Sequence, residues 1–283
     1  MKIIKLVLLT LLVTFTYAKE RIVTLSPAIN EIVYALGVGE QVVANTEYCT
    51  YPKASQLVPK VGGYFSASLE KVVAYKPTLV LVQKNNEKLA HKLKKLNIKT
   101  AVIQIDTLTH IKEAISQIGS LVGRKQKAQS IIRSIEYELS QIQNIVTDKK
   151  ILIVIGHNTT LVKRIFVAGQ NLYFDNIIEA SGNSNALQSK RKGQPILNRE
   201  NLIASNPDIV ILLAPRKEAY NLQESDLIEP WDSLPIGASK NHNIYIIDKD
   251  YAGIPSDRLV NFLQDFKAIL TQVKAHQKVK VTP

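Results

Sequence analysis

The sequence predicts an α/β protein of two Rossmann-like lobes with parallel-sheet cores, joined by a single long α-helix. Three observations support this fold class: a segment that recurs at a constant offset, strand and helix signals that alternate in both halves, and an amphipathic stretch between the halves. Alternating strands and helices make parallel sheets covered by helices, because parallel strands need crossover connections.

The recurring segment reads SLEKVVAYKPTLVLV at 68–82 and NRENLIASNPDIVIL at 198–212, an offset of 130 residues without a gap. Each copy has a capping residue, a carboxylate at the second helical position (Glu70 or Glu200), a short apolar stretch, a proline and an apolar run. Capping residues and early carboxylates favour a helix start, and β-branched runs after proline favour a buried strand. Each copy therefore predicts a helix that leads into a strand.

The duplication extends beyond this pair. RIVTLSP at 21–27 and KILIVIG at 150–156 each predict a strand that opens one half. NEIVYALG at 30–37 and DNIIEASG at 175–182 predict short helices ended by glycine, the usual residue where the chain turns left-handed.

The stretch between the halves predicts one rigid helix over 124–146, about six turns and roughly 35 Å long. It lacks proline and glycine, whereas a flexible linker would be rich in them. Its apolar residues lie at helical spacing at positions 128, 131, 132, 135, 139, 142, 145 and 146. We expect four segments: a signal peptide at 1–18, an N-terminal lobe at 19–122, a bridging helix at 123–148 and a C-terminal lobe at 149–283.

The N-terminus predicts export. Residues 1–18 carry two lysines, an apolar stretch too short and too interrupted to span a membrane, and a small residue at Ala18. We expect cleavage near Ala18 and a soluble periplasmic protein. Removing Lys2 and Lys5 from the net charge of +12 leaves +10. The lysines are scattered and no nucleic-acid motif accompanies them, so we expect no nucleic-acid partner.

The order of these segments resembles the periplasmic binding proteins that serve ABC importers of iron complexes, haem and cobalamin. The resemblance is carried by RIVTLSPAINEIVYALGVGEQVVA, YPKASQLVPKVGGYFSASLEKVVAYKPTLVLV, NRENLIASNPDIVIL and NHNIYIID. It implies two Rossmann-like lobes bridged by one helix, as the periodicity does independently. It also implies that Glu70 and Glu200 insert among arginines of an ABC permease dimer at the inner membrane, and that the protein is a monomer that carries a small-molecule metal complex. The alternative is that each glutamate only stabilises the start of its helix.

Ligand-binding residues are expected at the carboxyl ends of the strands, where open parallel sheets place their sites. Aromatic rings there can pack on a flat ligand, and arginines can pair with its carboxylates or phenolates. The candidates are Tyr48, Tyr51, Tyr64 and Phe65 in the N-terminal lobe and His157, Arg164, Arg191, Trp231 and Tyr251 in the C-terminal lobe.

Three ligand classes stay open. The basic pairs and triplets at 163–164, 190–192 and 216–217 favour an anionic ferric chelate of siderophore type, which we place ahead of cobalamin. Tyr64 stands where the resemblance to cobalamin-binding relatives places a pocket tryptophan. Haem is third, because Gly193 and Gln194 stand where haem-binding relatives tend to have a tyrosine, although His157 or Tyr251 could serve as a ligand.

An exported enzyme is the alternative from a different class, and the sequence offers little for it. It has no GxxxxGK loop, no GxSxG elbow and no HExxH motif, and its five histidines lie far apart. We therefore expect no catalytic residues, no protein-held metal and no covalently bound cofactor. Cys49, the single cysteine, is expected to be packed rather than reactive.

Overall fold

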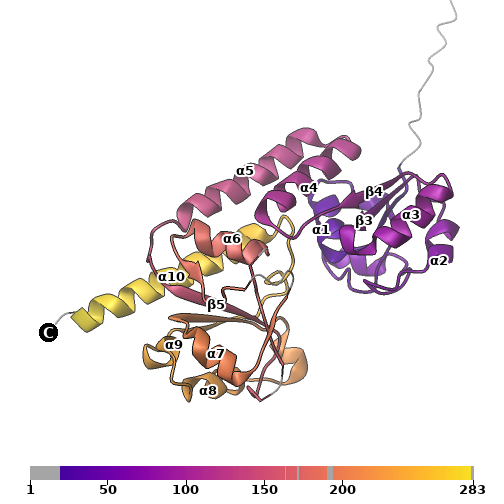
Figure 1. Ribbon diagram of the computed structural model, residues 1–283. Helices are drawn as coiled ribbons and strands as arrows, with labels where there is room; N and C mark the ends of the chain where they lie inside the picture. Colours follow the sequence, from indigo (N-terminus) through magenta and orange to yellow (C-terminus); the bar gives the residue numbers. More distant parts are fainter. Residues whose placement is uncertain (1–19, 163, 171, 190–193, 282–283) are drawn as a thin grey trace, which may run out of the picture.

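The computed structural model describes residues 20–162, 164–170, 172–189 and 194–281 (Figure 1). The expected signal peptide at 1–18 lies outside the described residues. The described chain forms two α/β lobes that lie side by side under a pair of helices, as the sequence predicts.

The N-lobe contains a four-stranded parallel sheet in the order β2-β1-β3-β4. Its helices α1, α2 and α3 and its 3-10 turns connect the strands, and α4 leads out of the lobe. The elements are β1 (Ile22–Thr24), α1 (Pro27–Ala35), η1 (Gly39–Gln41), β2 (Val42–Asn45), η2 (Lys53–Leu57), α2 (Leu69–Ala74), β3 (Leu79–Gln83), η3 (Lys84–Asn86), α3 (Glu87–Lys95), β4 (Thr100–Ile103) and α4 (Leu108–Leu121).

The C-lobe contains a sheet in the order β10-β9-β5-β6-β8, with β7 paired to β5. Its core pairs, β10 with β9, β9 with β5 and β5 with β7, are parallel, whereas β6 and β8 pair antiparallel at the edge. The elements are β5 (Lys150–Ile155), β6 (Ile165–Val167), α6 (Tyr173–Ala180), β7 (Ser184–Asn185), β8 (Ile196–Leu197), α7 (Arg199–Ser205), β9 (Ile209–Leu213), η4 (Lys217–Tyr220), α8 (Glu224–Asp232), α9 (Gly237–Lys240), β10 (Ile244–Ile247) and α10 (Leu259–Val281).

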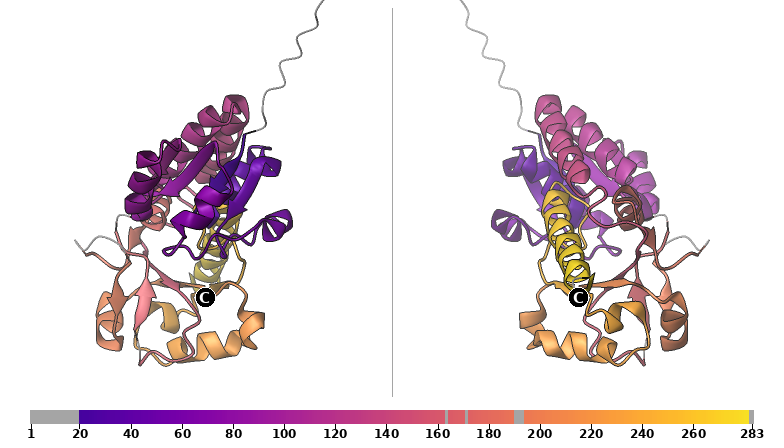
Figure 2. Two further views of the ribbon diagram at one scale, coloured as in Figure 1. Left: turned by 90° about the vertical axis from the view of Figure 1, so that its right-hand side faces the viewer. Right: turned by 90° about the vertical axis from the view of Figure 1, so that its left-hand side faces the viewer.

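Helix α5 (Lys125–Gln141) connects the lobes and packs against α4 and α10 (Figures 1 and 2). Its predicted apolar face is correct, since Ala128 and Ile135 are buried in the core and Ile131, Ile132 and Leu139 pack against it. Its predicted length is not: the helix spans 17 residues, about 26 Å at 1.5 Å per residue. Asn144 takes a left-handed conformation with φ 56°, and its backbone N–H bonds the carbonyl oxygen of Ser181 at 3.1 Å, so the chain turns into the C-lobe.

The central strands β1, β3, β5 and β9 are buried on both faces, and their side chains alternate between apolar clusters. In β3, Leu79 and Leu81 face the cluster that contains α1, α4 and α5, whereas Val80 and Val82 face a second cluster below α2 and α3. Strand β9 repeats this alternation 130 residues later, from Ile209 to Leu212. The first cluster runs without a break from the N-lobe sheet through α4, α5 and α10 to the C-lobe sheet. The two lobes therefore share one continuous core.

Further contacts join the lobes besides α5. Around the start of α4, the backbone N–H of Tyr173 donates to the carbonyl oxygen of Asp106 at 2.7 Å, and the backbone N–H of Leu108 donates to Oδ1 of Asn176 at 3.1 Å. On the other side of the junction, Arg258, just before α10, makes a bidentate ion pair with Glu31 on α1, with N–O distances of 2.5 and 3.0 Å. Both side chains of this pair are buried.

Candidate functional site

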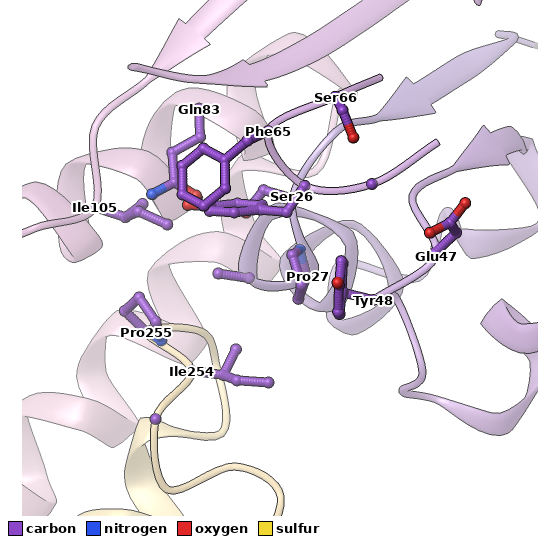
Figure 3. Close-up of a pocket in the computed structure, with 14 residues that line it drawn as sticks. Ser26, Pro27, Glu47, Tyr48, Phe65, Ser66, Gln83, Ile105, Ile254 and Pro255 are labelled. Carbon is purple, nitrogen blue, oxygen red and sulfur yellow. The ribbon is translucent and has the colours of Figure 1, made fainter. Parts of the chain in front are cut away.

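One hollow, which we call the main hollow, lies at the carboxyl ends of the four N-lobe strands, where the fold class predicts a site. It has a volume of about 600 Å³ and is closed on one side by the C-lobe loop that precedes α10. In Figure 3, Ile254 and Pro255 approach from this loop, opposite the N-lobe residues. It is lined by Ser26, Pro27, Ala28, Glu47, Tyr48, Gly63, Tyr64, Phe65, Ser66, Gln83, Ile105, Gly253, Ile254 and Pro255.

A tight turn at 62–67 presents the aromatic wall of the main hollow. Gly62 has φ +121°, and a Cβ there would meet the backbone oxygen of Ser66 at 2.6 Å, so the turn requires glycine. The ring of Tyr64 packs edge-on against Phe65 at 4.4 Å between centroids. The side chain of Phe65 is 74% exposed, so its ring is accessible to a ligand. The turn therefore offers an aromatic surface to an incoming ligand.

Tyr64 is held in place by two asparagines of η3. Its hydroxyl accepts a hydrogen bond from Asn85 at 2.8 Å, and its backbone oxygen accepts one from Asn86 at 2.6 Å. Burial raises the pKa of Tyr64, which keeps the phenol protonated at neutral pH. Held in this way, Tyr64 can pack its ring on a ligand.

The charge of the main hollow is negative. Among the described residues that line it, the one with a charged side chain is Glu47, and none is basic. The other polar side chains are the hydroxyls of Ser26, Ser66, Tyr48 and Tyr64 and the amide of Gln83, whose Oε1 accepts from Ser26 at 2.8 Å. The hollow is thus mostly apolar and aromatic, with a few polar groups at defined places.

A second hollow of about 460 Å³, which we call the side hollow, lies between the lobes and shares Glu47 with the main one. Its N-lobe walls are polar residues of the β2–η2 loop and η2, together with Lys60. Its C-lobe wall is formed by two charged residues that follow β9 and β10. It is lined by Glu47, Cys49, Thr50, Gln56, Lys60, Arg216 and Asp250.

Of the predicted ligand residues, the structure brings three together in the main hollow: Tyr48, Tyr64 and Phe65. Tyr51 lies close by but covers the guanidinium of Arg258, which stands 3.8 Å from the ring centroid. Tyr251 is partly buried and donates its hydroxyl proton to Asp265 at 2.8 Å, so it supports the C-lobe loop and lines neither hollow.

The predicted C-lobe residues scatter. His157 donates from Nε2 to the carbonyl oxygen of Pro215 at 2.8 Å, and its ring lies against Tyr220 at 4.4 Å. Arg164 is exposed at the end of the loop before β6 and lines neither hollow. Arg191 lies outside the described residues.

The prediction that Trp231 lines the ligand cleft is wrong. Its side chain is fully buried in the C-lobe cluster that contains Leu227, Leu234 and Ile236. Position 231 falls on the inward face of α8, and apolar burial of so large a side chain is worth more there than exposure in a loop. Tryptophan therefore serves as core in this lobe.

Sequence reasoning missed Glu47, Gln83 and the loop at 253–255, and it considered Arg216 only as part of the basic pair at 216–217. Glu47 and Gln83 could have been found, since they follow predicted strands at the carboxyl edge of the sheet. The 253–255 loop could not, because its position depends on how the C-lobe packs on α1.

The interlobe ion pair is part of a larger network behind the hollows. Arg258 also donates from Nη1 to Asp250 at 2.7 Å, and Ser256 donates its hydroxyl proton to Glu31 at 2.5 Å. Burial raises the pKa of Glu31, while its hydrogen bonds with Arg258 and Ser256 oppose that effect. This network fixes the loop that carries Ile254 and Pro255 into the main hollow.

The two repeated glutamates occupy equivalent places at helix starts. Glu70 lies in the first turn of α2, where Ser68 caps the helix by accepting from the backbone N–H of Lys71 at 3.2 Å. Glu200 lies in the first turn of α7, where Asn198 accepts from Asn201 at 2.9 Å. Both carboxylates are exposed. Hydrogen bonds from its own backbone N–H and from Ser68 lower the pKa of Glu70.

Cys49 is packed, as expected. Its side chain is 1% exposed, and its Sγ lies 3.2 Å from the hydroxyl of Thr46. Burial raises the pKa of the thiol, so it stays protonated at neutral pH. Within the described ranges, no group of three or more histidine, cysteine, aspartate or glutamate side chains could hold a metal ion. Likewise, no described helix is both long and apolar enough to cross a membrane.

Comparison with known proteins assigns this architecture. The family model described as "Periplasmic binding protein" matches residues 22–251, well over half of the chain. The chain belongs to the periplasmic binding protein family. Two relatives of this periplasmic binding protein are an uncharacterized ABC transporter substrate-binding lipoprotein of Bacillus subtilis and the vitamin B12-binding protein of Salmonella typhimurium. The first is 25% identical over 89% of this chain and 80% of its own; the second is 25% identical over 77% and 81%.

Solved structures of the same fold include the periplasmic vitamin B12-binding protein of Vibrio cholerae, with a TM-score of 0.75 and 20% identity over 90% of this chain and 98% of its own. The periplasmic haem-binding protein of Vibrio cholerae has a TM-score of 0.72 and 24% identity over 90% and 99%. At these identities the structures establish the fold of this periplasmic binding protein.

Proposed function

We propose that this protein is the substrate-binding component of an ABC importer, and that it delivers a corrinoid of the cobalamin type to its permease. The observation that carries the ligand class is the main hollow, which is aromatic and apolar and has no basic residue among the described residues that line it. A large ligand that is close to neutral and has a broad apolar face fits such walls. The relatives described as vitamin B12-binding proteins support the same class.

An anionic ferric chelate, the ligand that the sequence favours, is the second candidate. Of the two arginines predicted to bind such a chelate, Arg164 lines neither hollow and Arg191 lies outside the described residues. The observation in its favour is that Arg216 and Lys60 line the side hollow. Haem is third, because no histidine is among the described residues that line either hollow, and the hydroxyl of Tyr64 is already bonded to Asn85 at 2.8 Å.

Isothermal titration with cyanocobalamin, a ferric hydroxamate chelate and haemin decides between these classes. The corrinoid should bind with micromolar or higher affinity, and removal of the aromatic wall in Phe65→Ala should weaken it. Tyr137→Ala, on the exposed face of α5, is the matched control. Intrinsic tryptophan fluorescence is a poor probe here, since the single tryptophan is buried in the C-lobe. Tight binding of the ferric chelate with no response to cyanocobalamin would exclude the corrinoid.

The cellular setting is part of the same proposal. Residues 1–18 serve as a signal peptide that is removed near Ala18, so that the lobes at 19–122 and 149–283, joined by the segment 123–148, function in the periplasm as a monomer. The relatives' names as periplasmic or lipoprotein substrate-binding proteins support export. Mass spectrometry of the protein purified from the periplasm tests the cleavage site. An intact N-terminus would contradict it.

A further inference from the structure

The side hollow has the features of a second ligand subsite. Glu47 lines both hollows, so the two spaces are adjacent and one ligand can contact both. Its character differs, because four of its seven lining residues are charged at neutral pH. A ligand body that packs on Tyr64 and Phe65 could therefore extend a polar group into the side hollow.

Two of those four charged side chains are already bonded to other groups of the protein. Lys60 donates from Nζ to Asn45 Oδ1 at 2.7 Å, to the carbonyl oxygen of Ser55 at 3.0 Å and to that of Cys49 at 3.3 Å. Three acceptors match the three protons of an ammonium group, so Lys60 has none left for a ligand. Asp250 is paired with Arg258 at 2.7 Å.

The other two charged residues face the hollow from opposite lobes. Glu47 follows β2 in the N-lobe, and Arg216 follows β9 in the C-lobe. Neither side chain makes a hydrogen bond or ion pair with another residue of the described chain. Unpaired charges of opposite sign in one hollow can each take a group of complementary charge from a ligand.

The backbone around Arg216 is fixed, which favours a built site. Arg216 adopts a left-handed conformation with φ 58°, which is uncommon for a residue with a side chain. Its backbone N–H donates to the carbonyl oxygen of Asp248 at 3.1 Å, and the next residue, Lys217, pairs with the Asp248 carboxylate at 2.8 Å. The β9–η4 turn is thus tied to the end of β10, and the guanidinium projects from a constrained backbone.

We propose that the side hollow binds an anionic oxygen group of the ligand through Arg216, while Glu47 accepts hydrogen bonds from amide N–H or hydroxyl groups of the same ligand. This subsite rests on the proposed function, in which the main hollow holds the ligand's apolar face. The anionic group is either a phosphodiester or a carboxylate, since the planar guanidinium can bind both in a bidentate manner. The ligand is then a molecule with an apolar body, amide or hydroxyl donors and one acidic arm.

Paired corrinoids test this assignment. Cobalamin has a phosphodiester in its nucleotide arm, whereas cobinamide lacks that arm and keeps the amide side chains. Arg216→Ala should weaken cobalamin about tenfold or more, because a hydrogen bond to a charged group is typically worth about 1.5 to 3 kcal/mol. It should change cobinamide less than about twofold. Glu47→Ala should weaken both corrinoids by a similar factor, since both carry the amides.

Controls and a second pair of probes complete the experiment. Arg133→Ala removes an exposed arginine on α5 that lines neither hollow and should leave both affinities unchanged. Thermal unfolding followed by circular dichroism verifies that every variant is folded. Haemin and its dimethyl ester repeat the comparison for a carboxylate: Arg216→Ala weakening haemin alone assigns the subsite to carboxylates, and weakening cobalamin relative to cobinamide assigns it to phosphodiesters.

The two proposals fail in different ways. Wild-type protein that binds a corrinoid while Arg216→Ala affects cobalamin and cobinamide equally overturns the subsite and leaves the proposed function standing. Wild-type protein that binds none of the four probes overturns both.

Discussion

At the scale of single residues, charge placement matters more than charge number. The chain has 36 lysine and arginine residues, yet none of the described residues that line the main hollow is basic. The arginine with the deepest structural role, Arg258, is buried and is used to hold Glu31 and Asp250. Net charge therefore gives no direct guide to the ligand.

Asp257, next to this arginine, supports a prediction about pH. Burial, and secondly the neighbouring Glu31, raise the pKa of Asp257 to about 6 from 3.8, and its Oδ1 has no hydrogen-bond partner in the described chain. The folded state then binds more protons than the unfolded state between about pH 4 and 6, so the contribution of Asp257 to stability falls as the pH rises through that range. Two pKa units correspond to an upper limit of about 3 kcal/mol.

Asp257→Asn should accordingly raise the free energy of unfolding at pH 7 by about 1 to 3 kcal/mol, and the gain should vanish near pH 4. Urea unfolding at pH 4, 5, 6 and 7 measures it. Asp232→Asn, at the exposed end of α8, is the control and should show no such trend. A gain that is equal at pH 4 and pH 7 would contradict the assigned pKa.

At the scale of elements, the recurrence of the segment 68–82 at 198–212 reflects a helix–strand unit that is present in both lobes. Strands β3 and β9 bury equivalent alternating positions. Helices α2 and α7 each start with a capping side chain and carry a glutamate in the first turn. Burial accounts for the apolar positions and capping for Ser68 and Asn198. Neither accounts for an exposed glutamate at the second helical position of both units, since a helix start gains only about 0.3 to 1 kcal/mol from it.

We therefore predict that Glu70→Ala combined with Glu200→Ala abolishes uptake through the cognate permease and changes ligand affinity less than about twofold. The reason is that both carboxylates are exposed at helix starts and line neither the main nor the side hollow. Carboxylate–arginine pairs across an interface give orientation as well as affinity. Titration measures binding, and uptake into vesicles that contain the permease measures delivery.

The matched control is Glu113→Ala with Glu179→Ala, which removes one exposed glutamate from α4 and one from α6. Uptake by this control should match the wild type. Loss of ligand binding with normal delivery in the Glu70 and Glu200 variant would refute a docking role.

At the scale of the whole molecule, the lobes are held together by helix α5, by hydrogen bonds around Asp106 and Tyr173, and by the Arg258–Glu31 pair. A continuous apolar core runs across the junction between the sheets. Helices packed along a shared core resist hinge bending, because bending would expose apolar surface to water. The hollows should therefore be largely formed before a ligand arrives.

Small-angle scattering with and without saturating ligand tests this rigidity. The radius of gyration should change by less than about 1 Å, the scale that separates preformed interfaces from rearranging ones. A larger decrease on ligand binding would show that the lobes close.

The ion pair between the lobes should respond strongly to removal of one partner. Arg258→Met leaves the Glu31 carboxylate buried without its main partner, and we expect a loss of about 3 to 5 kcal/mol in the free energy of unfolding. The double variant Arg258→Met with Glu31→Met should recover most of it, since well-packed apolar replacements of buried pairs are often close to neutral. Urea unfolding compares the variants, and a double variant as unstable as the single one would show that the pair is not the cause.

Local patterns in the sequence were sufficient for the fold and for part of the site. Some features depend only on contacts within a segment or on the periodicity of burial, so they can be predicted from the sequence. These are the repeat at 68–82 and 198–212, the glycines at 37 and 182, and the apolar face of α5. The aromatic cluster of Tyr48, Tyr64 and Phe65 was also predictable, because all three follow or lie near the carboxyl ends of adjacent strands.

Tertiary packing alone decided which C-lobe residues reach the site. The family relationship and the two-lobe architecture could be inferred from the sequence by itself, since they depend on many segments in register. Trp231 lies in the core, Arg164 is exposed away from both hollows and Arg216 lines the side hollow, although all three lie in the half of the chain where binding residues were expected. Side-chain direction in a loop depends on backbone conformation and on neighbours distant in sequence, as the left-handed Arg216 and the docking of the 253–255 loop on the N-lobe both illustrate. These long-range contacts have no periodic signature, and only the folded chain brings them together.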